Sequence, residues 1–248
     1  MKSLSVKLGV ILIGIAIFGY TEVWGSGATS SSSINLEPLI YTVLGFVLGL
    51  FGNLILERIK RKWLRKDFVN ALYAQFKELV PKLAGNYLIL KIDLGEMDRD
   101  ALNWIKSVKS QGYQFLEDKT VEAIDKFLKL NDDQIRVVNQ LNKQKPPKAS
   151  FIKKFNLPVL DENISSISLL DSDLQYSLLD IKTKINWLNE IVERHNFFFE
   201  KTFDSGISRE NWEIIDSNIR EGYAQLGKWC RNTSELIMKL LKELSGTK

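Results

Sequence analysis

LIYTVLGFVLGLFGNLIL (residues 39–56) is a stretch of 18 residues without a charged side chain, and it runs directly into ERIKRKWLRK (residues 57–66). At about 1.5 Å per residue, an α-helix of this length reaches roughly 27 Å, which is close to the hydrocarbon thickness of a bilayer. The sequence therefore predicts a transmembrane helix over residues 38–57.

A basic juxtamembrane segment, residues 58–66, follows the predicted span. Lys and Arg residues next to a span stay on the cytoplasmic side, and they are also attracted to anionic lipid headgroups. We therefore expect the protein in the inner or plasma membrane, with residues 67–248 in the cytoplasm and with membrane lipid as a partner. The six cations are Arg58, Lys60, Arg61, Lys62, Arg65 and Lys66.

The positive charge is concentrated in this segment. The whole chain has a net charge of +4, residues 57–66 carry six cations against Glu57 for a net +5, and the charges of residues 1–56 cancel. Residues 67–248 are therefore left with a net −1. This balance does not favour the basic surface that nucleic-acid binding requires, so we do not expect a nucleic-acid partner.

The chain before the predicted span has two interpretations. Residues 1–24 contain a 13-residue apolar run, Leu8–Tyr20, behind Lys2 and Lys7. This is the length of a signal-peptide core, whereas Tyr20 and Trp24 resemble the interfacial aromatic residues of an uncleaved first span. Residues 25–37 form a Gly- and Ser-rich extracytoplasmic loop. Either interpretation leaves residues 67–248 on the cytoplasmic side.

Three glycines share one face of the predicted span: Gly45, Gly49 and Gly52. The first two form a GxxxG pattern, which allows two membrane helices to approach closely. This face could join two copies of the protein, or this span to the first; the alternative is that glycine is simply frequent in membrane helices. Asn53 is the one strongly polar side chain of the run, and it would be a candidate pore-lining residue.

Several shorter helices are predicted after the basic segment. Apolar residues recur every three or four positions over residues 60–90, and Pro81 should kink or restart that helix. Asp98 or Asp100 should cap the next helix. Two further helices are expected at about 119–130 and 132–143, the second entered through a capping box of Asn131 and Gln134.

The loop predicted over residues 143–158 is rich in proline and lysine and contains no acid before Pro158. Its cations could simply be solvated, or they could contact anionic headgroups or an anionic small ligand. The five candidates for such a contact are Lys143, Lys145, Lys148, Lys153 and Lys154.

The clearest pattern predicts a long antiparallel helical hairpin over residues 172–244. Apolar positions alternate in steps of four and three along two helices of about 30 and 35 residues, with Ser172 and Ser208 as predicted caps. Gly222 should admit a bulky neighbour from the opposite helix. The first seam is Leu174, Leu178, Ile181, Ile185, Leu188, Val192, His195 and Phe199, and the second is Trp212, Ile215, Ile219, Gly222, Leu226, Trp229, Thr233, Leu236 and Leu240.

No constellation for catalysis is recognisable. The single histidine, His195, falls within the first seam, where a hairpin centred on its loop would place it near Asp216 and Ser217. Zinc needs several Cys or His ligands, whereas Cys230 is the only cysteine, and we expect it to be a buried apolar residue. We therefore predict no catalytic, cofactor-binding or metal-binding residues.

The sequence thus predicts an all-α protein: a transmembrane helix or two-helix hairpin, then a cytoplasmic antiparallel helical bundle that ends in the long hairpin. We expect a non-enzymatic protein whose bundle binds a protein partner, self-associates or transmits a signal. The alternative is an oligomeric membrane effector or pore assembled through the glycine face and gated by the bundle.

Overall fold

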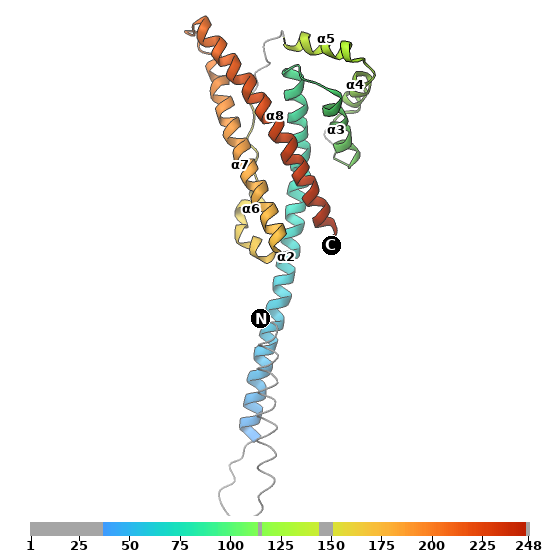
Figure 1. The fold of residues 1–248 in the computed structure, drawn as a ribbon. Helices are drawn as coiled ribbons and strands as arrows, with labels where there is room; N and C mark the ends of the chain where they lie inside the picture. The colour runs from blue at the N-terminus through green and yellow to red at the C-terminus, as the bar shows by residue number, and fades with distance from the viewer. Residues whose placement is uncertain (1–36, 114–115, 144–150, 247–248) are drawn as a thin grey trace, which may run out of the picture. The chain divides into compact units, whose positions relative to one another are not determined.

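The fold is described from a computed structural model, which defines residues 37–113, 116–143 and 151–246 of the 248-residue chain (Figure 1). The predicted first span or signal peptide lies outside these residues, as do nearly all of the loop 25–37 and the cations Lys145 and Lys148. Every regular element in the described ranges is helical and none is a strand, which confirms the all-α prediction.

The described residues form one very long helix followed by seven shorter elements and form parts of two compact units, Met1–Lys62 and Trp63–Lys248. Packing is described below for the second unit. The elements are α2 (Glu37–Asp93), α3 (Arg99–Ser110), α4 (Asp118–Leu128), α5 (Asp132–Lys143), α6 (Pro158–Glu162), the 3₁₀ helix η1 (Ile164–Leu169), α7 (Ser172–Lys201) and α8 (Arg209–Gly246).

Helix α2 continues through Pro81 without ending, so the expected restart at this residue is wrong. A proline inside a helix removes one backbone hydrogen bond and costs about 3 kcal/mol. Its neighbours Val80 and Leu83 are completely buried, and burying two aliphatic side chains contributes a free energy of the same order, about 1.5–3 kcal/mol each. Tertiary packing therefore holds the helix together where local preference would interrupt it.

The turn after α2 depends on Gly95. This residue has φ = 61°, and the amide of Glu96 donates to the carbonyl oxygen of Lys91 at 3.0 Å, which closes the helix end in the Schellman manner. A Cβ atom at Gly95 would lie 2.3 Å from the backbone oxygen of Asn139 in α5. Only glycine allows both this backbone conformation and the close approach of α5.

Helices α7 and α8 pack along each other through the predicted apolar seams (Figure 1). All first-seam residues on α7 from Leu174 to His195 are buried, and Phe199 at its end is half-buried. The helices are 30 and 38 residues long, close to the predicted lengths.

The register of α7 against α8 differs from the prediction. The His195 side chain lies against Gly222, where a Cβ atom would be 3.6 Å from its ring, and it stacks on Tyr223 with ring centroids 4.8 Å apart. The expected proximity of His195 to Asp216 and Ser217 is therefore wrong. Gly222 does admit a bulky neighbour, as predicted, and it lies opposite His195 five or six residues beyond the position expected for a hairpin centred on its loop.

The same shift accounts for Trp212. This residue was predicted to lie in the seam, but it is 43% exposed. With His195 opposite Gly222, an antiparallel register places Trp212 opposite residue 205, and α7 has already ended at Lys201. Trp229, by contrast, packs edge-on against Trp187 with centroids 5.4 Å apart.

Helix α8 also packs against α2. A Cβ atom at Gly227 would lie 3.9 Å from both Leu90 and Tyr87, so the two helices approach closely at this point. The predicted single seam therefore understates the buried surface of α8. Further buried residues are Tyr223, Cys230, Ser234, Ile237, Met238, Leu241 and Leu244.

Three predicted caps are confirmed and one is corrected. The hydroxyl of Ser208 accepts from the amide of Asn211 at 3.2 Å and caps α8. Asn131 and Gln134 exchange reciprocal backbone and side-chain hydrogen bonds of 2.9 Å, which is the expected capping box of α5. Asp98 accepts from the amide of Ala101 at 2.7 Å and caps α3. The cap of α7 is Asp171, not Ser172, because its carboxylate accepts from the amide of Leu174.

Two substitutions at Gly222 should have opposite effects on stability. Gly222→Ala adds one methyl group at an ordinary contact distance of 3.6 Å from His195 and removes backbone entropy from the unfolded chain, so it should stabilise the protein by up to about 1 kcal/mol. Gly222→Leu overfills the same space and should destabilise it by about 1–3 kcal/mol.

Chemical denaturation of the purified full chain, followed by circular dichroism, measures both changes. Gly206→Ala, at the α7–α8 connection, is the matched control. Equal effects of alanine and leucine at position 222 would show that α7 and α8 do not meet there.

Candidate functional site

Helix α2 is, within the described part of the chain, the one helix long and apolar enough to cross a membrane. This criterion concerns length and composition only. No side chain in its most apolar 18-residue window is buried by the rest of the described structure. Tyr41, Phe46 and Leu48 are each at least 66% exposed.

The predicted glycine face on this helix is open. A methyl group added at Gly45, Gly49 or Gly52 would meet no atom within 4 Å among the described residues, apart from the backbone of the helix itself. The three glycines therefore leave a strip of α2 backbone accessible to another helix.

The six cations of the basic segment all lie within α2, and two of them have acidic partners. Arg61 pairs with Glu57 at 2.6 Å, and Arg65 pairs with Asp171 at 3.2 Å. The described residues supply no ion pair for the other four, which are Arg58, Lys60, Lys62 and Lys66.

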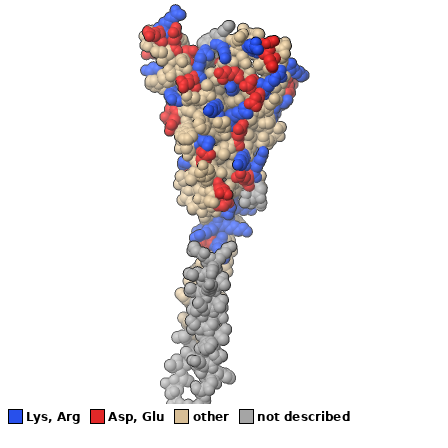
Figure 2. All heavy atoms as spheres, in the orientation of Figure 1, with Lys and Arg blue, Asp and Glu red and all other residues tan. Residues whose placement is uncertain are grey.

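The lysine-rich loop is only partly described. Lys143 ends α5, Lys153 is exposed, and Lys154 forms an ion pair with Glu193 of α7. Of the three described lysines, Lys154 is thus already neutralised within the protein. On the face shown in Figure 2, Lys and Arg of the second unit are interspersed with Asp and Glu.

Two asparagines on α7 form a site that the sequence analysis did not identify. Asn196 accepts from the amide of Ile152 at 3.0 Å and donates to the carbonyl oxygen of the same residue at 2.9 Å. Asn189 makes the same pair of bonds to Phe155, both at 2.8 Å. Each side-chain amide therefore forms hydrogen bonds with both the backbone N–H and the backbone C=O of one residue in the non-helical segment 151–157.

A sequence signal for this site exists, although it is weak. Asparagine is a poor residue for a helix interior, and two of them recur at a spacing of seven beside the seam positions Leu188 and His195. The spacing places both amides on one side of α7. Nothing in the sequence identifies the backbone that they bind.

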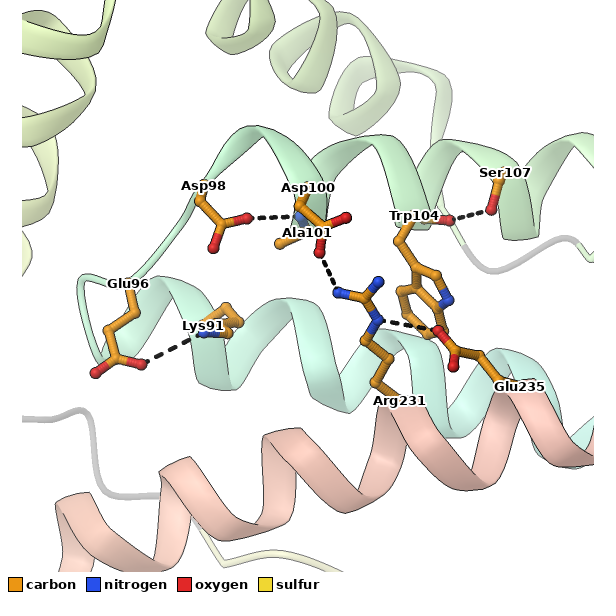
Figure 3. Close-up of polar contacts among 9 residues, drawn as sticks. All are labelled: Lys91, Glu96, Asp98, Asp100, Ala101, Trp104, Ser107, Arg231 and Glu235. Carbon is orange, nitrogen blue, oxygen red and sulfur yellow. Dashed lines mark hydrogen bonds and ion pairs between the residues drawn. The ribbon is translucent and has the colours of Figure 1, made fainter.

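A polar junction between α2, α3 and α8 is also new (Figure 3). Arg231 of α8 donates to Asp100 of α3 and to Glu235 at 3.0 Å, and its guanidinium lies 5.5 Å from the ring centroid of Trp104. The hydrogen bond from Arg231 holds the pKa of Asp100 below its usual value. Trp104 packs edge-on against Tyr87 of α2. The cation is thus matched by two carboxylates and an aromatic face.

The described residues contain no group of three or more His, Cys, Asp and Glu side chains that could hold a metal ion. His195 is 1% exposed and lies among seam residues. Cys230 is also 1% exposed, as expected for a small apolar residue, and burial raises the pKa of its thiol to about 12.

Cys230 should be chemically inert in the folded protein. With a pKa of about 12, only about one thiol in ten thousand is ionised at pH 8, and the buried sulfur cannot reach a reagent. Native full-length protein should therefore not react with a thiol-specific reagent over minutes. Protein unfolded in guanidinium should react with one equivalent of the reagent per chain. Rapid reaction of the native protein would show that α8 is exposed at this position.

The comparisons with known proteins add no assignment to this geometry: no family model, curated protein or solved structure matches the chain.

Proposed function

We propose that this chain is a non-enzymatic membrane protein, anchored by the first part of α2, whose helical domain of residues 67–248 binds a protein partner or transmits a signal on the cytoplasmic side. In this proposal α2, α7 and α8 form an antiparallel bundle with the shorter helices, and residues 1–24 are either a first span or a cleaved signal peptide.

The observation that carries the proposal is the exposed apolar stretch Ile40–Leu56. Apolar surface of this extent is not stable in water without cover, and its helical length of roughly 26 Å suits a bilayer core. A core helix of a soluble protein would instead be buried by its neighbours, whereas none of this window is buried.

The basic segment supports both the orientation and the lipid contact. Four of its cations, Arg58, Lys60, Lys62 and Lys66, have no ion pair among the described residues, so their charges are available to phosphate groups. Each Lys or Arg near an anionic bilayer surface contributes about 1 kcal/mol of attraction. The same cations oppose transfer across the membrane, which favours the cytoplasm for residues 67–248.

The end of the α7–α8 hairpin supports a macromolecular partner. Phe197, Phe203, Trp212 and Ile214 are exposed there, and Lys201 lies over the ring of Phe197 at 5.5 Å. Exposed aromatic residues with nearby charges are typical of protein-binding surfaces. This composition favours binding over catalysis as the role of the domain.

Neutralising the four cations should lower the fraction of chains that insert with residues 67–248 in the cytoplasm. The variant Arg58→Gln, Lys60→Gln, Lys62→Gln, Lys66→Gln removes the charges that retain the segment in the cytoplasm. A Cys230→Ala, Ser245→Cys background supplies one exposed thiol for a membrane-impermeant maleimide in intact cells. We expect no labelling of the parent and measurable labelling of the neutralised variant.

The matched control removes four exposed lysines away from the anchor: Lys119, Lys129, Lys239 and Lys242. This control protein should not react with the impermeant maleimide in intact cells. The proposal fails if the parent protein is released from membranes by alkaline carbonate, or if its Ser245→Cys thiol is labelled in intact cells.

A second candidate function is favoured by the open glycine face. An oligomeric membrane effector or pore would assemble through Gly45, Gly49 and Gly52, because close helix packing in a membrane needs a strip without side chains. Asn53 would then be a polar side chain available to the pore.

The variant Gly45→Leu, Gly49→Leu should separate the oligomers of the second candidate into smaller species. The mass of the full chain in lipid nanodiscs measures this change, and Leu44→Ile, Leu48→Ile is the control. A parent of four or more copies that the glycine variant dissociates, together with ion release from liposomes, would support the pore. A monomer or dimer indifferent to the variant would leave only the anchored binding protein.

A further inference from the structure

A groove in the second unit lies between α2 and the chain that leads into α6. Its volume is about 580 Å³, which is within the range of roughly 300–1,000 Å³ that is typical of ligand sites. The residues that line it on α2 extend from Ala71 to Lys82, about 16 Å along the helix, and the other wall consists of residues between Lys154 and Val159. The groove is therefore long enough for about five residues of extended chain.

Gln75 belongs to the α2 wall, and its side-chain amide has no hydrogen-bond partner among the described residues. Both the nitrogen and the oxygen of this amide are covered by protein, and a covered polar group without a partner destabilises the fold. Such a local cost is expected at a binding residue. Helical side chains lean toward the preceding turn, where Ala71 carries only a methyl group, so the Gln75 amide has room to turn into the groove.

Part of the opposite wall belongs to a segment that is held in an extended conformation. Asn189 and Asn196 of α7 are seven residues apart, which is about 10.5 Å along a helix. The backbone units that they bind, in Phe155 and Ile152, are three residues apart. Three residues reach about 10 Å only when the chain is extended, so the segment runs antiparallel to α7 with an extended backbone.

The extended segment has unused backbone groups in the groove wall. Lys154 and Asn156 line the groove, and the described residues supply no hydrogen-bond partner for the backbone N–H and C=O groups of either residue. Extended backbone with free donors and acceptors can bind a second extended chain beside it. One wall thus offers free backbone groups, and the other offers the side-chain amide of Gln75.

The charges of the groove favour an uncharged occupant. Every charged side chain in its described lining is paired: Glu78 and Lys82 with each other at 2.6 Å, and Lys154 with a glutamate of α7. Leu79 and Phe155, which also line the groove, are buried apolar residues. A charged group placed here would lose its water without gaining a free partner, whereas a peptide backbone with apolar side chains matches this lining.

We infer that this groove binds an extended, uncharged segment of a protein partner, with one residue of that segment held by the Gln75 amide. The donor and acceptor of a side-chain amide match the N–H and C=O of a single residue, as Asn189 shows with Phe155 at 2.8 Å. This binding mode rests on the proposed function, because it takes the partner to be a protein. It does not rest on the anchor, since the groove lies within Trp63–Lys248.

Gln75→Met tests the cost of the unpaired amide. Methionine has a similar length and no group that needs a strong hydrogen bond, so the full chain without peptide should unfold at a higher guanidinium concentration than the parent. Gln140→Met, at an exposed position of α5, is the matched control and should leave the midpoint unchanged. A midpoint that falls or stays the same with Gln75→Met would show that the amide is already satisfied, and would overturn the inference.

Peptide selection tests the binding itself. A displayed library of random eight-residue peptides is selected on the purified full chain in detergent, and the selected peptides are labelled and titrated. We expect binders with about five consecutive uncharged residues, and about tenfold weaker binding or less to Gln75→Met, because two hydrogen bonds are lost. Ala74→Trp fills the groove from an exposed position of α2 and should abolish binding, whereas Ala123→Trp, at an exposed position of α4, should bind as the parent does.

Three results would overturn this assignment. They are a library without binders, binders whose affinity is unchanged by both Gln75→Met and Ala74→Trp, and binders that copy a stretch of this chain, which would assign the groove to a second copy. Each of these would leave the exposed aromatic end of the α7–α8 hairpin as the surface for a protein partner. The maleimide labelling of the anchor is decided separately, so failure of the groove and failure of the proposed function are distinguishable.

Discussion

Helix α8 packs against both α7 and α2, and it offers each of them a surface without a side chain, at Gly222 and at Gly227. The two glycines are five residues apart, which is about 140° around the helix axis, so they face different neighbours. His195 of α7 fits against the first, and Tyr87 and Leu90 of α2 approach the second. The arrangement of the long helices in Trp63–Lys248 depends on this pair of close approaches, because a bulky side chain at either position would move one neighbour away.

At three places in Trp63–Lys248, side-chain amides hold backbone that belongs to no helix. Buried amide and carbonyl groups must find partners, and a connection packed against a helix has no strand beside it to supply them. An asparagine supplies a donor and an acceptor in a fixed geometry, and one such residue can satisfy a whole backbone unit. Three pairs use this arrangement: Asn139 with Met97, Asn189 with Phe155, and Asn196 with Ile152.

The fold class and the buried faces of α7 could be predicted from the sequence, because burial imposes a helical period that apolar residues reveal directly. The register of α7 against α8 could not be predicted, since an apolar period shows which face of each helix is buried but not which residues of the two seams lie opposite each other. The fit of His195 to Gly222 selects among these registers, and that fit exists only in three dimensions.

Some candidate sites could be recognised from the sequence and others could not. The open glycine strip and the basic segment were recognisable because each consists of neighbouring residues on one helix. The asparagine site was not, because its ligand is the backbone of a segment more than thirty residues away, and backbone has no sequence signature. Lys154 was a candidate for contact with an anionic headgroup or ligand, and it forms an ion pair with Glu193, a contact that also depends on the same segment.

Pro158 helps to fix the register in which the segment 151–157 lies on the asparagine site. A slip of three residues would restore the match between extended chain and helix turns, and in one direction it would bring Pro158 opposite Asn189. Proline has no amide hydrogen, so the side-chain oxygen of Asn189 would lose its donor. The opposite slip would replace the Ile152 side chain with the methyl group of Ala149. Each slipped register would thus lose a hydrogen bond or buried apolar surface because of the residues in and next to the segment. The segment therefore occupies this face in a single register.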